Sequence, residues 1–139
     1  MADYVIIGGG SSGGVIASRL SEDPDVTVCL LEAGGPGTSP LVSTPGAFAA
    51  LIQDYRINTL NWRFNTDPSK ALNDRRLYNP RGKMLGGSSG MNGMVYIRGD
   101  RSDFDHWAEL GNDGWGYNDV LPYFRKAENN ERGEDEFHG

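Results

Sequence analysis

Two glycine-rich stretches in this chain have the spacing of loops that approach phosphate groups. In the first, which follows the apolar run Asp3–Ile7, the residues Gly8, Gly10 and Gly13 fit the pattern G-x-G-x-x-G. The first glycine permits a tight turn out of a strand, the second lets the backbone approach a pyrophosphate, and the third lets the next helix lie close to the sheet. Two serines after Gly10 add hydroxyl donors where the free amides of a helix N-terminus favour an anion. The stretch therefore predicts a binding site for the pyrophosphate of a dinucleotide.

Glu32 supplies the acidic residue that such a site needs. It follows the apolar run Val26–Leu31 directly, about 20 residues after the glycines. A carboxylate at this point accepts hydrogen bonds from a ribose 2′-hydroxyl and repels a 2′-phosphate, so NADP is disfavoured. Spacing does not separate NAD from FAD, because both contain an ADP half. The alternative, an ordinary turn beside a solvated glutamate, leaves the order of strand, glycines, helix, strand and acid unexplained.

The elements that must position these residues form a β-α-β unit. Asp3–Ile7 is mostly apolar and β-branched, which predicts a strand buried on both faces. Val26–Leu31 is the second expected strand, and Cys29 within it is expected to be a small buried hydrophobe. The helix between the strands should end at Asp23–Asp25. It should turn an apolar stripe toward the sheet, formed by Val15, Ile16, Ala17 and Leu20.

The composition restricts the class of protein. The chain has 139 residues and a net charge of -6, which disfavours a nucleic-acid surface. It contains no apolar run near the roughly 20 residues that span a bilayer, no visible signal peptide, and a single cysteine that cannot form an internal disulfide. We therefore expect a cytoplasmic protein without a membrane span. The acidic residues do not have the spacing of a metal site.

The β-α-β rhythm stops after Glu32, so we expect three parts. Residues 1–34 form the first β-α-β unit, residues 35–100 form an extended segment, and residues 101–139 form a helical segment with a charged tail. The middle part is far longer than an ordinary loop of about 4–6 residues. Because it has too few periodic hydrophobic residues to pack on itself, we expect a ligand or further polypeptide to order it.

The last part contains two expected helices. Ser102 is the expected N-cap of the first, with Asp105 in capping-box position, and Gly111 ends this helix. Pro122 is expected in the first turn of the second helix. Residues 128–139 are charged and almost free of hydrophobic residues, which predicts a solvated tail.

Several other conspicuous residues have structural explanations that outweigh functional ones. The aspartates near these helices are better explained as helix caps or solvated side chains than as metal ligands. The tryptophans are better explained as packing residues than as substrate contacts. Arg98 is better explained as a residue that braces a loop. The aspartates and tryptophans concerned are Asp103, Asp105, Asp113, Asp119, Trp62, Trp107 and Trp115.

The second glycine-rich stretch, which starts at Arg81, is the most specific motif of the chain. The run from Gly82 to Asp105 resembles the first signature of the glucose-methanol-choline (GMC) oxidoreductase family along its whole length. Residues 3–34 resemble the FAD-binding start of that family, and Asn61–Pro68 resembles its tryptophan-containing segment. The resemblance implies an α/β fold, a Rossmann-like FAD-binding domain of GMC type that is incomplete in this chain.

The resemblance also implies which residues hold FAD. The first glycine turn would bind the pyrophosphate and Glu32 the adenosine ribose, while the segment 35–100 would cover the flavin, with glycines that permit close approach of backbone amides. In some relatives a histidine near this loop binds the flavin covalently. Met91 stands at the matching position, so a noncovalent FAD is expected. The implied cofactor-binding residues are Gly8, Gly10, Ser11, Ser12, Gly13, Glu32, Ala33, Arg81, Met84, Gly87, Ser88, Asn92, Gly93, Met94 and Val95.

Finally, the resemblance implies an activity and a missing part. Family members oxidise an alcohol by hydride transfer to the flavin, with a histidine base near the end of a chain roughly four times longer. His106 and His138 do not match that position, so no catalytic residue is expected within residues 1–139. We expect an FAD-dependent alcohol oxidase or dehydrogenase acting on a small alcohol, with its C-terminal remainder present as a second chain or subunit. The alternatives are an FAD-containing hydroxynitrile lyase and a non-catalytic nucleotide-binding subunit.

Overall fold

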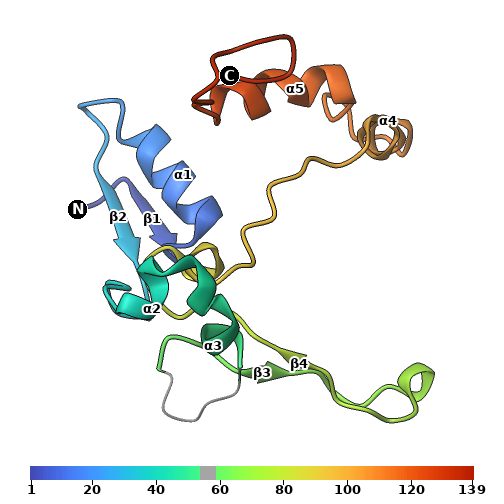
Figure 1. Ribbon diagram of the computed structural model, residues 1–139. Helices are drawn as coiled ribbons and strands as arrows, with labels where there is room; N and C mark the ends of the chain where they lie inside the picture. Colours follow the sequence, from blue (N-terminus) through green and yellow to red (C-terminus); the bar gives the residue numbers. More distant parts are fainter. Residues whose placement is uncertain (54–58) are drawn as a thin grey trace. The chain divides into compact units, whose positions relative to one another are not determined.

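The chain forms two compact units. The computed structural model describes residues 1–53 and 59–139, which divide into unit 1 (Met1–Val95) and unit 2 (Tyr96–Gly139) (Figure 1). Of the extended segment 35–100, residues 54–58 lie outside the described residues. Among the residues described, no helix combines the length and the apolar character needed to cross a membrane.

Unit 1 begins with the expected β-α-β unit. Strand β1 (Tyr4–Ile7) pairs in parallel with strand β2 (Val28–Leu31), with Ile7 opposite Leu31. Helix α1 (Ser11–Leu20) connects them and lies along one face of the pair (Figure 1). The two strands and the helix between them are confirmed, although each is shorter than the sequence predicts.

The β-α-β unit is more exposed than expected. Ile7 is 86% exposed and Val5 is 60% exposed, so the prediction that β1 is buried on both faces is wrong for this chain. Val15 and Ile16 of α1 are also exposed, by 59% and 49%. The half-buried face of α1 is instead formed by Gly13, Ala17 and Leu20, which recur at helical spacing. Cys29 is half-buried.

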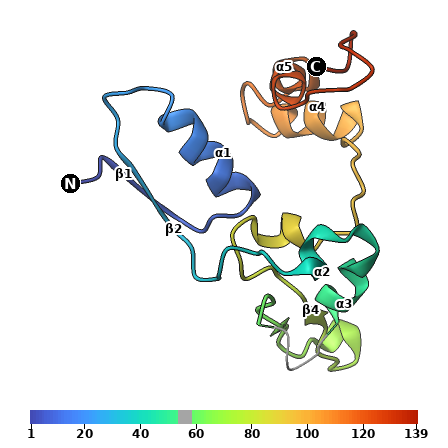
Figure 2. The ribbon, with the colours of Figure 1, turned by 60° about the vertical axis from the view of Figure 1, so that its left-hand side comes forward.

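The middle of unit 1 consists of short elements around a small hydrophobic core. Leu51, Met84 and Met91 are 1%, 0% and 3% exposed and contact one another. Figure 2 shows the glycine-rich loop that carries both methionines beside α2 and α3. The expectation that this segment cannot pack on itself is therefore wrong. Its elements are α2 (Pro40–Ser43), η1 (Pro45–Ala47), α3 (Phe48–Ile52), β3 (Phe64–Asn65), η2 (Lys70–Leu72), β4 (Tyr78–Asn79) and η3 (Gly87–Gly90), of which β3 and β4 form an antiparallel hairpin.

A buried asparagine joins this core to the hairpin. Asn61 is 3% exposed, and its amide nitrogen donates to the Leu51 carbonyl at 3.0 Å and to the Tyr78 hydroxyl at 2.9 Å. Its amide oxygen accepts from the backbone N–H groups of Arg63 at 2.9 Å and Arg81 at 3.2 Å. One side chain therefore forms hydrogen bonds with four groups of the core and the hairpin.

Unit 2 is a pair of helices, α4 (Arg101–Glu109) and α5 (Tyr117–Lys126). The N-cap of α4 is Asp100, two residues before the expected Ser102. Its carboxylate accepts from the Ser102 hydroxyl at 2.6 Å and from the Ser102 backbone N–H at 2.9 Å, and these bonds lower the pKa of Asp100. Pro122 lies inside α5 and not in its first turn, because the helix starts earlier, at Tyr117.

Aspartates and aromatic rings hold the two helices together. Asp105 accepts a hydrogen bond from the Tyr117 backbone N–H at 2.9 Å, so a side chain of α4 caps α5. Phe104, which is 9% exposed, contacts the rings of Trp107, Tyr117 and Phe124 at centroid distances of 5.5–6.2 Å. Asp103 and Asp119 are the capping-box residues of α4 and α5. The expectation that Asp105 completes the capping box of α4 is wrong, because the box is formed by Asp100 and Asp103 and Asp105 caps α5. The packing role of Trp107 and Trp115 is confirmed.

Residues 128–139, here called the closing loop, fold back onto α5. The Asn130 backbone N–H donates to the Gly139 carbonyl at 2.8 Å, and the Arg125 side chain donates to the His138 carbonyl at 3.3 Å. The expectation of a solvated tail is therefore wrong, because charged side chains bond to backbone groups within the same unit.

We predict that Asn61→Ala lowers the free energy of unfolding by about 2–4 kcal/mol, because it removes four buried or part-buried hydrogen bonds. Asn65→Ala is the matched control, since Asn65 is exposed and donates to one carbonyl, that of Arg63, at 3.3 Å. Urea unfolding of both variants of the complete protein measures the difference. Equal effects of the two substitutions would contradict the structural role given to Asn61.

Candidate cofactor site

The first glycine turn has the geometry that its spacing predicts. Gly8 has φ of +98°, which favours glycine, and its N–H donates to the Leu31 carbonyl at 2.7 Å. A Cβ atom added to Gly13 would lie 1.9 Å from the Gly8 carbonyl oxygen. The turn out of β1 and the close packing of α1 are thus confirmed. The first N–H groups of α1, from Ser11 onward, lack acceptors within the helix and are available to an anion.

Glu32 is held beside this turn by backbone amides. One carboxylate oxygen accepts from Gly9 N–H at 2.7 Å and the other from Gly34 N–H at 2.8 Å. Glu32 is half-buried, and these two hydrogen bonds fix the orientation of its carboxylate. Because each carboxylate oxygen has a further lone pair, it can also accept from a ligand hydroxyl.

The second glycine-rich stretch meets the first one backbone to backbone. Gly86 N–H donates to the Gly9 carbonyl at 2.8 Å, and a Cβ atom added to Gly87 would lie 2.9 Å from the Cα of Gly10. Gly87 also has φ of +56°. The two motifs, far apart in the sequence, therefore form adjoining walls, and the absence of side chains on both permits the contact.

Two further glycines bring the strand end and the second stretch together. A Cβ atom on Gly34 would lie 2.0 Å from the Lys83 carbonyl oxygen, and one on Gly82 would lie 2.1 Å from the Gly87 carbonyl oxygen. Leu85 N–H donates to the Gly35 carbonyl at 2.8 Å. The segment after β2 thus lies against the loop that follows the hairpin.

These walls enclose an open cavity of about 520 Å³. Its lining includes five of the residues that the sequence assigns to the cofactor, and it adds apolar side chains from both strand ends and one aromatic ring. The predicted residues are Gly8, Gly10, Glu32, Ala33 and Gly87, and the others are Ile7, Leu31, Trp62 and Gly82.

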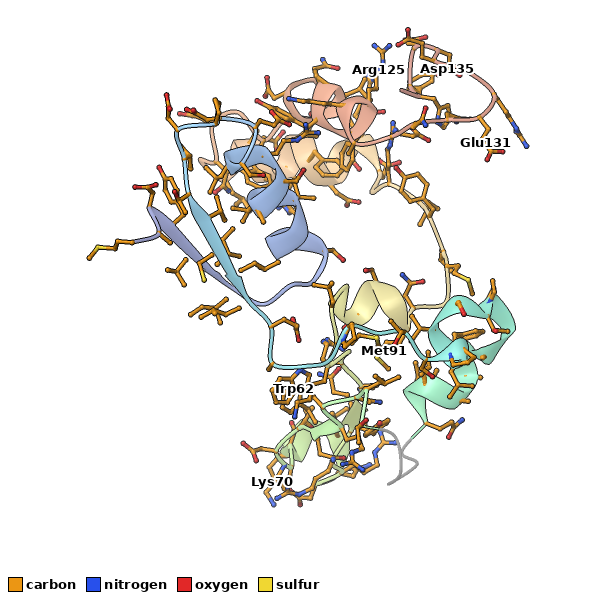
Figure 3. All side chains as sticks on the ribbon, turned by 90° about the vertical axis from the view of Figure 1, so that its left-hand side faces the viewer. Trp62, Lys70, Met91, Arg125, Glu131 and Asp135 are labelled. Carbon is orange, nitrogen blue, oxygen red and sulfur yellow. The ribbon has the colours of Figure 1, made fainter. Side chains whose placement is uncertain are left out.

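Trp62 lines this cavity, although the sequence predicts only a packing role for it. Its ring stacks on Phe64 at a centroid distance of 5.6 Å, and the Lys83 ammonium lies 4.6 Å from the ring centroid. Figure 3 labels Trp62 in unit 1, and the residue is 41% exposed. The signal that could have found it is its place in Asn61–Pro68, the segment that resembles GMC sequence.

The other predicted residues of the second stretch do not line this cavity. Met84 and Met91 lie in the hydrophobic core, so a contact of Met84 with a cofactor would involve its backbone. Asn92 forms a local turn in which its amide oxygen accepts from Met94 N–H at 2.7 Å, and Met94 has φ of +56°. The remaining ones are exposed or half-buried near this turn or at the hairpin base, namely Arg81, Ser88, Gly93 and Val95.

The chain belongs to the GMC oxidoreductase family. The family model described as "GMC oxidoreductase" matches residues 2–136. The oxygen-dependent choline dehydrogenase of Yersinia pestis (strain Pestoides F) is 55% identical over an alignment of 140 positions, which covers 99% of this chain and 24% of that protein. The chain thus spans about a quarter of the curated relatives it matches. GMC oxidoreductases are FAD-dependent.

Solved structures of the family have the same fold. Pyridoxine 4-oxidase from Mesorbium loti has a TM-score of 0.90 at 40% identity, with 100% of this chain and 27% of that chain covered. A formate oxidase structure from Aspergillus oryzae RIB40, which concerns the effect of a mutation on FAD modification, has a TM-score of 0.79 at 36% identity. The match covers 90% of this chain and 22% of that chain. The expected fold class, an incomplete FAD-binding domain of GMC type, is confirmed.

We predict that Gly13→Ala sharply reduces the FAD content of the purified protein, because the added methyl collides with the Gly8 carbonyl and separates α1 from the turn. Gly14→Ala is the control in the same helix, since a Cβ there has no atom within 4 Å. This control should keep its FAD and gain about 0.5–1 kcal/mol of stability. The flavin-to-protein ratio and the melting temperature measure both effects, and equal FAD loss in the two variants would contradict the packing argument.

Proposed function

We propose that the complete protein oxidises an alcohol with FAD, and that residues 1–95 hold the ADP half of the cofactor and cover its flavin. The observation that carries this proposal is the cavity in which the first glycine turn, Glu32 and Gly87 of the second stretch meet. FAD, when bound, supplies the acceptor for the hydride that leaves the alcohol carbon. Choline is the first alcohol to test, because choline dehydrogenases are 55% and 49% identical to this chain.

In this proposal the polar walls of the cavity recognise the ribose and the pyrophosphate. Glu32 accepts hydrogen bonds from the adenosine ribose with the lone pairs that Gly9 and Gly34 leave free. The first N–H groups of α1, with Ser11 and Ser12, bind the pyrophosphate next to Gly10. Trp62 offers the flat apolar surface that an adenine ring requires, beside Ala33.

The second stretch would cover the flavin. Its glycines carry no side chain that blocks a flat ring, and the turn fixed by Asn92 holds the backbone around Gly93 and Met94 in one conformation. Backbone amides held in this way can bond to polar atoms of the ring and exclude water from it. Val95 would lie at the end of this cover.

In this proposal the proton of the alcohol is taken by a residue outside residues 1–139. His106 is exposed and lies 3.5 Å from Glu109, and His138 is bonded to Glu128, both within unit 2. We therefore propose that the base and the substrate pocket belong to further polypeptide, in the same chain or in a second chain or subunit. The cytoplasmic location expected from the sequence stays a prediction.

The proposal predicts that the yellow absorbance of the flavin disappears when the complete protein is mixed with its alcohol without oxygen. Choline, pyridoxine and aryl alcohols are the first panel, and a tertiary alcohol, which has no hydrogen on its carbinol carbon, is the control. Cleavage of a cyanohydrin without bleaching would instead identify a lyase. Bound FAD without either reaction would indicate a nucleotide-binding subunit.

We further propose that the FAD is noncovalent. Met91, at the position where some relatives attach the flavin to a histidine, is 3% exposed within the hydrophobic core, and a thioether does not form such a bond. Precipitation of the protein with acid should therefore release all of the yellow chromophore into the supernatant. Flavin that stays in the washed pellet would contradict the proposal.

Trp62→Ala should weaken FAD binding by about 1–3 kcal/mol, the range of base stacking on an aromatic side chain. Trp62→Phe should retain most of the affinity. Because the contact is proposed for the adenine, apoprotein titrations should show a similar loss for ADP and none for FMN. An equal loss for FMN would place Trp62 at the flavin and overturn this part of the proposal.

A further inference from the structure

A cluster of opposite charges lies within unit 2. The side chain of Glu128 is 12% exposed and that of Arg98 is 16% exposed. Arg98 Nη2 donates to Glu128 Oε2 at 2.9 Å, and His138 Nδ1 lies 3.0 Å from Glu128 Oε1. Among the ion pairs given for the described residues, this is the pair with the most deeply buried partners.

The same cluster holds the two ends of the closing loop. Arg98 Nη1 donates to the Phe137 carbonyl at 2.6 Å, and Gly139 N–H approaches Glu128 Oε2 at 3.4 Å. Glu128 is the first residue of the loop, whereas Phe137 and Gly139 are at its other end. Figure 3 labels Arg125 of α5 beside Asp135 of this loop, and it labels Glu131 at the outer bend of the loop.

An aromatic ring also positions the Arg98 side chain. Its guanidinium lies 5.2 Å from the ring centroid of Phe124, which itself packs on Phe104. Arg98 belongs to the signature run Gly82–Asp105, yet its bonds in the described structure go to Glu128 and Phe137. Arg98 thus braces the closing loop, whereas the sequence-based expectation concerned the glycine-rich loop from Arg81 to Val95.

We propose that Arg98, Glu128 and His138 form an ionic latch that keeps the closing loop shut. Arg98 is the permanently charged partner of this latch, and it holds Glu128 and the Phe137 carbonyl at the same time. His138 adds a second contact to the Glu128 carboxylate, from its ring Nδ1. Both ends of the closing loop therefore depend on the Glu128 carboxylate and on Arg98.

The charged surroundings of His138 support this assignment. Its ring faces the Glu128 carboxylate, its backbone N–H donates to Asp135 Oδ1 at 2.7 Å, and its carbonyl accepts from Arg125, which in turn lies 3.6 Å from Glu134. The hydrogen bond from His138, followed by that from the Gly139 N–H and the charges of His138 and Arg98, lowers the pKa of Glu128 below 4.5, although its burial opposes this. The carboxylate therefore stabilises the closed loop above that pH, and the contribution is lost as the pH falls through the lowered pKa.

Hydrogen exchange of the complete protein tests the latch. The protection factors of the Asn130 and Asp135 amides, which are bonded to the Gly139 and His138 carbonyls, report closure, and the Leu110 amide of the α4 end reports folding of unit 2. We expect Arg98→Met to lower loop protection by about tenfold, because it removes the bonds to Glu128 and to the Phe137 carbonyl. Arg98→Lys should restore most of it.

Two further variants separate the parts. His138→Asn should reduce loop protection by less than Arg98→Met, because it leaves the bond between Arg98 and Glu128 in place. Arg132→Met, which removes a guanidinium from the exposed part of the same loop, should change nothing. Unchanged protection in Arg98→Met would overturn the latch. If Leu110 also loses protection in Arg98→Met, the His138→Asn result decides: a loss confined to the Asn130 and Asp135 amides supports the latch, and its absence refutes it.

Discussion

The structure of unit 1 depends on the close approach of backbone to backbone at four glycines. Gly13 touches the Gly8 carbonyl, Gly34 the Lys83 carbonyl, Gly82 the Gly87 carbonyl, and Gly87 the Cα of Gly10. A Cβ atom at any of them would lie at most 2.9 Å from the opposing atom. These contacts join the β1–α1 turn, the end of β2 and the loop after the hairpin into one set of walls. The cavity exists because these segments carry no side chains where they meet.

The small core behind these walls explains how a segment without periodic hydrophobic residues is ordered. Leu51, Met84 and Met91 come from three places in the sequence, and two of them are flexible methionines that fill irregular space. Asn61 supplies hydrogen bonds in place of a regular sheet between this core and the hairpin. Specific polar contacts and a few buried side chains therefore replace the periodic pattern that a helix or a sheet would need.

The GMC signature is divided between two tasks. Its glycine-rich first part belongs to unit 1 and contacts the first glycine turn, whereas its later part starts unit 2 with Arg98 and the Asp100 cap of α4. In unit 2 the buried ring of Phe104 and the carboxylates of Asp105 and Glu128 connect segments from both ends. A motif that is one continuous stretch in the sequence thus contributes to the candidate cofactor site in unit 1 and to the contacts that hold unit 2 together.

The sequence alone determined the β-α-β unit, the turn at Gly8, the packing of Gly13 and the family. These features depend on residues close in sequence, where spacing directly sets which atoms meet. The sequence predicts the N-cap of α4 two residues too late. Ser102 and Asp100 are both good caps, and their residue types alone do not decide between them.

Tertiary structure decided the rest. Trp62 reaches the cavity, Met84 and Met91 enter the core, and residues 128–139 fold back on Arg98, each through contacts between segments far apart in the sequence. The exposure of Val5 and Ile7 likewise depends on what covers the β1–β2 pair, since an apolar strand has the same pattern whether or not a second layer is present. Local spacing specifies turns and helices, but burial is a property of whatever the folded chain brings against them.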